Sequence, residues 1–349
     1  MKLDLNNKII LLLVLVIAVS VFFSANIVSA QSQENKLAAI FPGSIQDADW
    51  NSLGYTALQK VASELEIQVN YSEQVAVPDV TRVVNEYIDL DYNILWIHGT
   101  QYNSAIFDLA EENPDVTFIV EQDTPLPQDF DNIITIKRNY YIGHYVLGAL
   151  ASEVTETGKI GFVGGLEISW TIGVVNAIQQ AVNDVNADLE FNYIYVGSFN
   201  DPLKTKQATE SLINNGVDVI MSGVNLGNYG MFRAVENADK PVYVTSIYTD
   251  KSELSPEHFL TSDLFNYNSL MTEIVDDIVN DGKKSGLYNM EYGEDKGRYI
   301  KLPVSNVSEN TNEWIEEIAG KVASGEIEVE ENLNEIEIEE DIIEEIEVD

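Results

Sequence analysis

Several loops of the sequence combine aromatic rings with amide and carboxylate side chains. In the first half these loops contain "SIQDADWNSLGY", "HGTQY" and "EQDTP", and in the second half "GGLEISW", "GSFNDP", "SGVNLGNYG" and "SIYTD". They contain almost no basic residue. Aromatic faces stack on planar molecules, while Asp, Asn and Gln supply directional hydrogen bonds. We expect these loops to converge on one cleft. Together they predict a binding site for a neutral, planar molecule that bears hydroxyl or amine groups.

The sequence offers little for catalysis or metal binding. Its histidines are His98, His144 and His258, and none lies in an HExxH or paired-histidine pattern that would indicate zinc. A GxSxG nucleophile motif is absent from the sequence. The stretch "GFVGGLEISW" lacks a Walker lysine and the GxGxxG spacing, so close packing of a strand on a helix explains Gly164 and Gly165 better than phosphate binding does. We therefore expect no catalytic activity, no cofactor and no metal.

The charge and cysteine content exclude further classes of function. The 349 residues include 58 acidic and 19 basic side chains, a formal net charge of −39. Nucleic-acid surfaces need clustered Lys and Arg, so we expect no nucleic-acid partner. An anionic ligand would also have to overcome the overall negative field. The sequence has no cysteine, which excludes disulfides, cysteine-ligated metals, thiol catalysis and a lipid-modified cysteine.

The N-terminus has the pattern of an export signal. Lys2 and Lys8 precede the apolar run "IILLLVLVIAVSVFF", and small residues lead up to Ala30. This pattern predicts a signal peptide over residues 1–30 that is cleaved after Ala30. The alternative is an uncleaved single-span anchor, because the apolar run approaches the length needed to cross a bilayer. In both cases the rest of the chain lies outside the cytoplasmic membrane.

Apolar, β-rich runs alternate with helical patterns from Lys36 onward. One series of runs extends from "KLAAIFPG" to "IITIKRN", and a second from "KIGFVGG" to "HFLTSDLF", with a helix at about 140–154 between them. This alternation predicts an α/β chain of two doubly wound, parallel-sheet lobes. We assign residues 36–140 plus about 262–325 to an N-terminal lobe and 141–261 to a C-terminal lobe. Ligands bind such folds at the carboxyl ends of the strands, which predicts a cleft between the lobes.

The last stretch differs from the rest in composition. "GEIEVEENLNEIEIEEDIIEEIEVD" is rich in acidic residues and has no aromatic residue. Like charges on one face of a strand oppose pairing. We therefore predict a solvated, mostly disordered acidic tail over residues 330–349, with binding of a cation or partner as the alternative.

Several motifs together resemble one known family. "TGKIGFVGG", "YVGSFNDPLKTKQA", "GVDVIMSG", "LSPEHFLTS" and "VASGEIEV" have the order and spacing of the basic membrane protein family, the solute-binding components of ABC importers related to the purine nucleoside receptor. "GSIQDADWNSLGYTAL" and "NYYIGHYVLGALASEVTETGKIGFVGG" resemble the opening and middle motifs of that family. The resemblance covers about 36–329. It implies a type I periplasmic-binding-protein fold, whose lobes are joined by a hinge of several chain crossings.

The resemblance also implies site residues. The aromatic residues that sandwich a base in nucleoside-binding members correspond here to Tyr55 and Phe199, which would explain an exposed Phe before the Asp201-Pro202 helix start. Asp47 has an alternative role as a helix cap and Trp50 as a packing residue between the lobes. The full set of expected ligand-binding residues is Gln46, Asp47, Trp50, Asn51, Tyr55, Glu121, Asp123, Trp170, Phe199, Asn225, Tyr248 and Asp250.

The sequence departs from the family pattern at positions that bear on the ligand. Gln46 replaces the first acid of the opening Asp-Asp pair, Tyr248 replaces the first acid of a late Asp-x-Asp segment, and Phe265 replaces a lysine. Trp170 adds a large ring where smaller residues are common. Carboxylates that would hold ribose hydroxyls are therefore partly missing, so a nucleobase or another small planar molecule competes with a nucleoside.

The resemblance implies a monomeric, non-enzymatic binding protein of an ABC importer, exported to the periplasm or the outer face of the cell membrane. Its expected partners are a small-molecule ligand, a membrane permease and an ATPase. An alternative is a sensory ectodomain that presents the ligand to a membrane signalling partner. A nucleoside hydrolase is disfavoured because no metal cluster or activated nucleophile is evident in the sequence.

Overall fold

The computed structural model describes residues 35–334. The predicted signal peptide at 1–30 and the tail residues 335–349 lie outside the described residues. Among residues 35–334, no helix combines the length and the apolar character needed to cross a membrane.

The N-terminal lobe is a six-stranded parallel sheet with the strand order β11-β5-β4-β3-β1-β2. Its strands are β1 (Lys36–Ile40), β2 (Gln68–Ser72), β3 (Ile94–Ile97), β4 (Thr117–Glu121), β5 (Ile133–Lys137) and β11 (Gly286–Asn289). Its helices are α2 (Trp50–Leu65), η1 (Val77–Asp79), α3 (Val80–Asp89), η2 (Thr100–Tyr102), α4 (Asn103–Glu112) and α9 (Asn268–Asp281).

The alternation of side chains along these strands places apolar groups on both faces of the sheet. Leu37 and Ala39 pack with the α2 and α9 side, whereas Ala38 and Ile40 pack with α3 and α4. Successive side chains of a strand point to opposite faces, so a continuous apolar run such as "KLAAI" is suited to a sheet covered on both sides.

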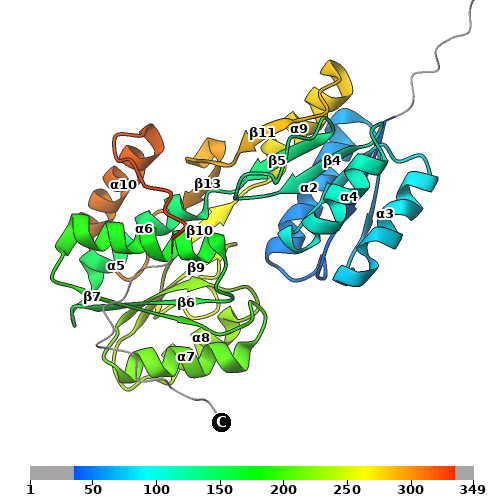
Figure 1. Cartoon of the computed structure of the whole chain (residues 1–349). Coiled ribbons are helices and arrows are strands. Elements are labelled where there is room, and N and C mark those ends of the chain that lie inside the picture. Colours follow the sequence, from blue (N-terminus) through cyan, green and yellow to red (C-terminus); the bar gives the residue numbers. More distant parts are fainter. Residues whose placement is uncertain (1–34, 335–349) are drawn as a thin grey trace, which may run out of the picture. The chain divides into compact units, whose positions relative to one another are not determined.

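The C-terminal lobe is a seven-stranded sheet with the order β12-β13-β10-β9-β8-β6-β7, in which β13 pairs antiparallel with β10. Figure 1 shows α5 and α6 on one side of this sheet and α7 on the other. Its strands are β6 (Lys159–Gly164), β7 (Glu190–Tyr195), β8 (Val219–Gly223), β9 (Tyr243–Tyr248), β10 (Phe259–Phe265), β12 (Glu291–Tyr292) and β13 (Gly297–Ile300). Its helices are α5 (Tyr140–Val154), α6 (Ser169–Asn186), α7 (Pro202–Asn214), α8 (Asn228–Glu236), η3 (Glu294–Lys296) and α10 (Glu309–Ser324).

The structure changes the expected assignment of the C-terminal third. Only α9 and β11 join the N-terminal lobe, whereas β10, β12 and β13 extend the C-terminal sheet and α10 packs against α5. The expectation that about 262–325 returns to the N-terminal lobe is therefore wrong outside α9 and β11. The reason is the antiparallel pairing of β13 with β10, which holds the chain on the C-terminal sheet after β11.

The chain passes between the lobes after β5, after β10 and after β11, and these crossings are bonded to one another or to β13. The amide of Met290 donates to the carbonyl of Lys137 over 2.8 Å, and that of Asn266 donates to Gly297 over 2.7 Å. Fully buried Arg298 pairs with Asp263 and donates to the Arg138 carbonyl over 3.0 Å. The hinge is thus one laterally hydrogen-bonded unit.

Gly143 on α5 makes space for the buried hinge pair. A Cβ atom at this position would overlap the carboxylate of Asp263 and lie 2.8 Å from Nη2 of Arg298. Heavy atoms do not approach this closely without displacement, so the hinge requires a residue without a side chain here.

Residues 330–334 do not follow the expectation of a solvated tail. The Glu330 amide donates to Gln180 of α6 over 3.0 Å, and Asn176 of α6 donates to the Asn332 carbonyl over 2.7 Å. Glu331 also forms an ion pair with Lys137 at 2.5 Å. The acidic segment therefore lies along α6 as far as the structure describes it.

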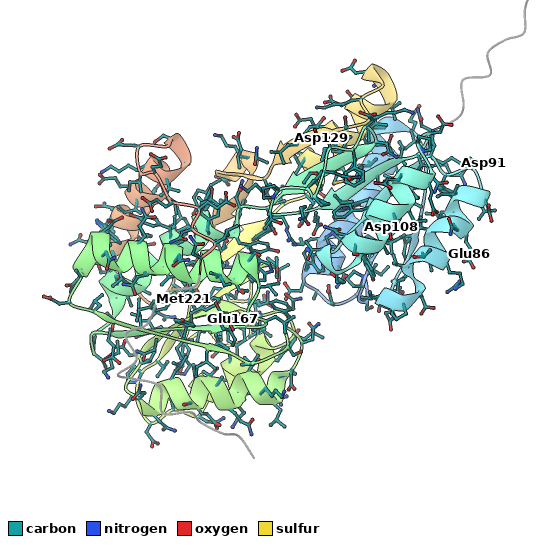
Figure 2. The ribbon with its side chains drawn as sticks, in the orientation of Figure 1. Glu86, Asp91, Asp108, Asp129, Glu167 and Met221 are labelled. Atoms are coloured by element: carbon teal, nitrogen blue, oxygen red, sulfur yellow. The ribbon has the colours of Figure 1, made fainter. Side chains whose placement is uncertain are left out.

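Acidic side chains are distributed over the surface. Glu86, Asp91, Asp108 and Asp129 are exposed around the N-terminal lobe, and Glu167 is exposed in the C-terminal lobe, as Figure 2 shows. In contrast, Met221 on β8 is fully buried in the core. This distribution lets water screen the repulsion between the carboxylates.

Candidate functional site

A cleft of about 410 Å³ lies at the carboxyl ends of strands from both sheets. This volume is in the range of small-molecule sites. The N-terminal lobe contributes the loops after β1, β3 and β5 and the start of α2, and the C-terminal lobe contributes α5 and the loops after β6 to β9. The residues that line the cleft are Pro42, Gly43, Trp50, Asn51, Thr100, Gln101, Arg138, Tyr140, Leu166, Ile168, Trp170, Phe199, Asn200, Asn225 and Tyr248.

Stacked aromatic rings form the C-terminal side of the cleft. Trp170 stacks on Tyr140, with ring centroids 4.3 Å apart, and on Phe199, with centroids 5.5 Å apart. The Tyr140 hydroxyl is 3.0 Å from that of Tyr248. Burial raises the pKa of Tyr140 to about 12, so this ring is neutral at physiological pH. The wall therefore presents apolar ring surface and uncharged hydroxyl groups.

The loop after β7 holds Phe199 in place through its backbone. The Phe199 carbonyl accepts hydrogen bonds from the amides of Asn225 and Gly227, over 2.9 and 3.1 Å. A Cβ atom at Gly165 would overlap the Phe199 ring, so Gly165 leaves space for this ring and not, as expected, for strand–helix packing. Phe199 is thus placed by the loops after β6 and β8 as well as by its own.

Trp50 is the aromatic residue that the N-terminal lobe places in the cleft. It stacks on buried His98 with ring centroids 4.0 Å apart, and its Nε1 donates to the Tyr267 hydroxyl over 3.3 Å. These contacts fix the indole ring on its inner side. Tyr55 is not among the lining residues; its ring packs edge-on against Tyr71 of β2 at 5.1 Å. The structure therefore does not bring Tyr55 and Phe199 together across the cleft.

The predicted carboxylates lie near the cleft but bind protein groups. Asp47 accepts from the amides of Ser52 and Asn51, over 3.0 and 3.1 Å, and from the Asn51 side chain over 2.6 Å. Asp47 therefore caps the start of α2, the role that the sequence analysis gave as the alternative to ligand binding. Gln46 is exposed and outside the cleft lining. The site residues that the structure does gather are Trp50, Asn51, Trp170, Phe199, Asn225 and Tyr248.

Glu121 and Asp123 both pair with Arg138. Glu121 is fully buried at the end of β4 and lies 3.1 Å from Nη1 of Arg138, while its other oxygen is 2.6 Å from Nδ1 of His98. Asp123 accepts from the Arg138 amide over 2.9 Å and pairs with Nη2. Burial alone lowers the pKa of Arg138, but Asp123 and Glu121 outweigh it and raise that pKa well above its ordinary value. Arg138 is therefore a permanent cation.

The sequence analysis missed Arg138 and Tyr140, and it included Gln101 and Asn200 only as members of the expected site loops. Arg138 follows the β5 run directly in "IITIKRN", at the same strand end that places other cleft residues. That position is the signal that would have identified it. Within the described chain, Arg138 is the one charged side chain that lines the cleft, so the expectation of lining carboxylates and an amine-bearing ligand is not supported.

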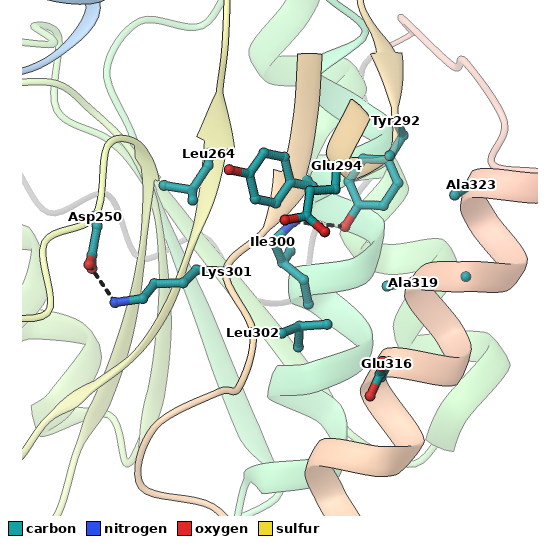
Figure 3. A pocket seen from close by; sticks show the side chains of 13 residues that line it. Asp250, Leu264, Tyr292, Glu294, Ile300, Lys301, Leu302, Glu316, Ala319 and Ala323 are labelled. Carbon is teal, nitrogen blue, oxygen red and sulfur yellow. Dashed lines mark hydrogen bonds and ion pairs between the residues drawn. The ribbon is translucent and has the colours of Figure 1, made fainter. Parts of the chain in front are cut away.

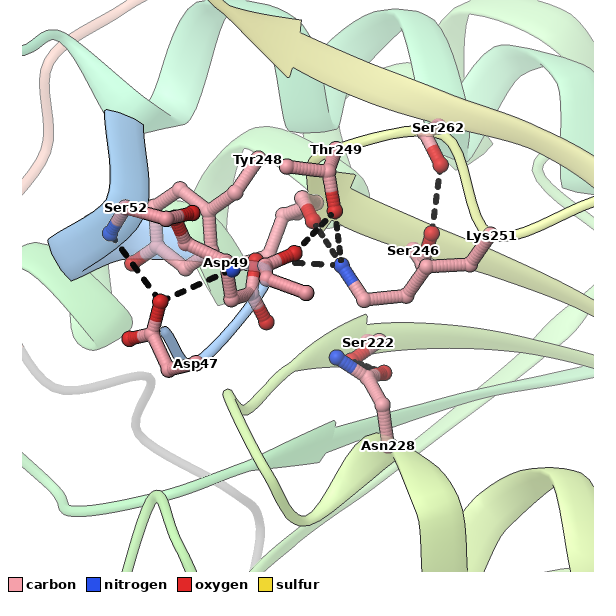
Figure 4. A network of polar contacts seen from close by, with 12 residues as sticks. Asp47, Asp49, Ser52, Ser222, Asn228, Ser246, Tyr248, Thr249, Lys251 and Ser262 are labelled. Atoms are coloured by element: carbon pink, nitrogen blue, oxygen red, sulfur yellow. Dashed lines mark hydrogen bonds and ion pairs between the residues drawn. The ribbon is translucent and has the colours of Figure 1, made fainter. Parts of the chain in front are cut away.

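An ion pair joins the two lobes beside the cleft (Figure 4). Nζ of Lys251, which follows β9, lies 3.1 Å from Oδ1 of Asp49, which precedes α2, and both side chains are nearly buried. Lys251 also donates to the Ile247 carbonyl over 2.7 Å, and the Thr249 hydroxyl donates to the Ala48 carbonyl over 3.1 Å. Burial raises the pKa of Asp49 to about 6 against the opposing charge of Lys251. This contact holds the lobes together next to Trp50.

A second hollow of about 490 Å³ lies between β10, β13 and α10 (Figure 3). It contains Asp250, which pairs with Lys301 instead of reaching the cleft. Its residues come from the C-terminal lobe and its extension alone, so a ligand there would not contact both lobes. Among residues 35–334, no group of acidic or histidine side chains is arranged to hold a metal ion.

The chain matches one family model over residues 34–333, described as ABC transporter substrate-binding protein PnrA-like. It is 25% identical over 329 residues to basic membrane protein B of Borreliella burgdorferi, covering 90% of this chain and 93% of that protein. It is 26% identical over 308 residues to the CD4+ T-cell-stimulating antigen of Listeria monocytogenes, covering 82% and 85%.

Solved structures show the same fold. An ABC transporter solute-binding protein from Aeropyrum pernix K1 has a TM-score of 0.72 at 18% identity, covering 86% of this chain and 94% of that one. An arabinose-binding protein from Geobacillus stearothermophilus has a TM-score of 0.59 at 14% identity, covering 81% and 99%. The predicted type I periplasmic-binding-protein fold is confirmed. With the family model matching nearly the whole described chain, this protein belongs to the PnrA-like family of ABC transporter substrate-binding proteins.

Proposed function

We propose that this protein is the extracytoplasmic solute-binding component of an ABC importer and that it captures a purine nucleoside or nucleobase in the interlobe cleft. The observation that carries the proposal is the ring surface from both lobes, Trp50 on one side and the Trp170–Phe199 stack on the other. Planar, neutral molecules bind such surfaces by stacking, and neighbouring amides fix their edges.

The amides that would fix a ligand come from both lobes. Asn51 and Gln101 belong to the N-terminal lobe, and Asn200 and Asn225 belong to the C-terminal lobe. An amide both donates and accepts, so this set suits the mixed edges of a heterocycle. A ligand that contacts both lobes favours the closed arrangement, because binding shifts an equilibrium only through differential contacts.

Closure would then present the loaded protein to its partners. The hinge crossings leave the two sheets intact, so movement between lobes can occur without unfolding either one. The partners are a membrane permease and a cytoplasmic ATPase, and the binding protein acts as a monomer. A closed, ligand-bound form is the species that a permease can distinguish from the empty one.

A thermal-shift measurement tests this function. The purified protein is heated with inosine, adenosine, hypoxanthine and adenine, and with arabinose and leucine as controls. A ligand that binds only the folded state raises the unfolding midpoint by mass action, about 2.7 kcal/mol of stabilisation at a hundredfold excess over its dissociation constant. A shift with nucleosides or bases alone supports the proposal, and a shift with the sugar or amino acid alone contradicts it.

A further inference from the structure

Arg138 gives the cleft a cationic group with a fixed orientation. Its guanidinium is bound on one side by Asp123, through Nε and Nη2, and by Glu121 through Nη1 at 3.1 Å. The guanidinium carbon lies 4.9 Å from the centroid of the Tyr140 ring. With a side chain only 4% exposed, Arg138 cannot swing away from these partners without leaving two buried carboxylates unpaired.

The bonds of Arg138 leave donors available to a ligand. A guanidinium has five N–H groups, one on Nε and two on each terminal nitrogen. The hydrogen bonds to Asp123 and Glu121 use one N–H of each nitrogen. Within residues 35–334, one N–H on Nη1 and one on Nη2 therefore remain without a protein acceptor, and Arg138 is among the residues that line the cleft.

These two donors select a particular chemical group. They cannot accept a hydrogen bond, so an amino group at this position would leave donor facing donor. An anionic group is disfavoured as well, because the guanidinium is already surrounded by two carboxylates and the chain carries a net charge of −39. The complementary group is a neutral pair of adjacent acceptors.

Hydrogen-bonding complementarity decides which part of a nucleoside can bind Arg138. Tyr140, against which the guanidinium lies, begins the ring series that continues through Trp170 to Phe199. Arg138 lines the same cleft as these rings, so a base bound there can present an edge to the guanidinium. A 6-oxopurine has adjacent acceptors at O6 and N7, the pair that arginine binds bidentately in nucleic acids, whereas adenine carries an amino donor at the same position.

We infer that Arg138 is a specificity-determining residue that binds the O6 and N7 edge of a 6-oxopurine and so selects inosine, guanosine or their bases over adenine derivatives. This inference rests on the proposed function.

Titration calorimetry with the purified full-length protein tests it through the ligand first. Inosine, purine riboside and adenosine differ at C6 of the base and in the proton on N1, which inosine alone carries. We expect inosine to bind about ten- to a hundredfold more tightly than adenosine, the discrimination of one bidentate pair, with purine riboside between them. Equal affinities for inosine and adenosine overturn the inference while the proposed function stands. If no nucleoside or base binds, the proposed function and this inference fall together.

A variant tests the role of the residue itself. Arg138→Lys keeps a cation between the carboxylates but removes the fork, so the ratio of inosine to adenosine affinity should fall to within about threefold. If the role of Arg138 is purely structural, the variant binds both nucleosides more weakly by the same factor and the ratio of the two affinities does not change. That result would also overturn the inference. Arg82→Lys is the matched control, because Arg82 is an exposed arginine on α3 paired with Glu86. It should leave both affinities unchanged.

Discussion

Replacing Lys251 with methionine should destabilise the protein strongly at high pH and weakly at low pH. The change keeps much of the apolar stem of the side chain but leaves Asp49 buried without its cation, which is 3.1 Å away. Removing one partner of a buried ion pair costs about 3–5 kcal/mol. In a chain of this size, that loss lowers the unfolding midpoint by about 5–8 °C.

The pH dependence follows from the pKa of Asp49. Burial raises this pKa from 3.8 to about 6, so the folded state disfavours the ionised carboxyl by about 3 kcal/mol. Because the folded pKa is raised, the contribution of Asp49 to stability is complete below 3.8 and is lost as the pH rises through 6. Without Lys251 the pKa rises further, because the lowering charge is gone. At about pH 5 Asp49 is then protonated, and the loss should shrink to about 1–2 kcal/mol for the missing hydrogen bonds.

Urea unfolding of the wild type and the variant at about pH 8 and about pH 5 measures the loss of stability at each pH. The matched control is Lys301→Met, which breaks an exposed pair with Asp250 and should cost under about 1 kcal/mol at either pH. The double variant Asp49→Asn with Lys251→Met removes both charges and should recover most of the stability. Equal losses for Lys251→Met and Lys301→Met, or a larger loss at pH 5 than at pH 8, would refute the reasoning.

Two further predictions concern the cleft and the hinge. Phe199→Ala should weaken ligand binding about ten- to a hundredfold in titration calorimetry, by loss of one stacking ring, whereas Tyr55→Ala should leave affinity unchanged because Tyr55 packs on Tyr71 outside the cleft. A loss in Tyr55→Ala equal to that in Phe199→Ala would restore the expected sandwich. Gly143→Ala should destabilise by about 1–3 kcal/mol because its Cβ meets the hinge pair, while Gly320→Ala, in an exposed part of α10, should stabilise by about 0.5–1 kcal/mol. The denaturation midpoints of the Gly143→Ala and Gly320→Ala variants are compared, and equal midpoints would falsify the argument that a Cβ at position 143 collides with the hinge pair.

The fold was predictable from the sequence because its signals are local. Continuous apolar strands and helical periodicity are written along the chain, and even the helix at about 140–154 coincides with α5. The assignment of β12 and β13 to a lobe was not predictable in the same way. β12 and β13 are 2 and 4 residues long, too short to show a period, and only their pairing assigns them to a lobe.

The site was predictable in its location but not in its charges. Strand ends mark the rim of the cleft, and Trp50, Asn51 and Phe199 lie there. Tyr55 lies one helical turn beyond Asn51, about 6 Å farther along α2 at 1.5 Å per residue, which takes it away from the rim. The pairing of Glu121 with Arg138 joins neighbouring strands β4 and β5, and no sequence pattern shows which partner a carboxylate will find.

The bonding between the chain crossings has a consequence for measuring motion. Two bodies joined by one flexible strand can swivel and twist, whereas three crossings, two of them hydrogen-bonded at Lys137–Met290 and the third bonded to β13 at Asn266–Gly297, restrict twisting. We therefore expect one distance between the lobes to follow opening. Since the sequence has no cysteine, two introduced cysteines at exposed Asp108 and Leu203 would carry spin labels or dyes at those sites alone. The protein is therefore suited to conversion into a single-distance sensor for its own ligand.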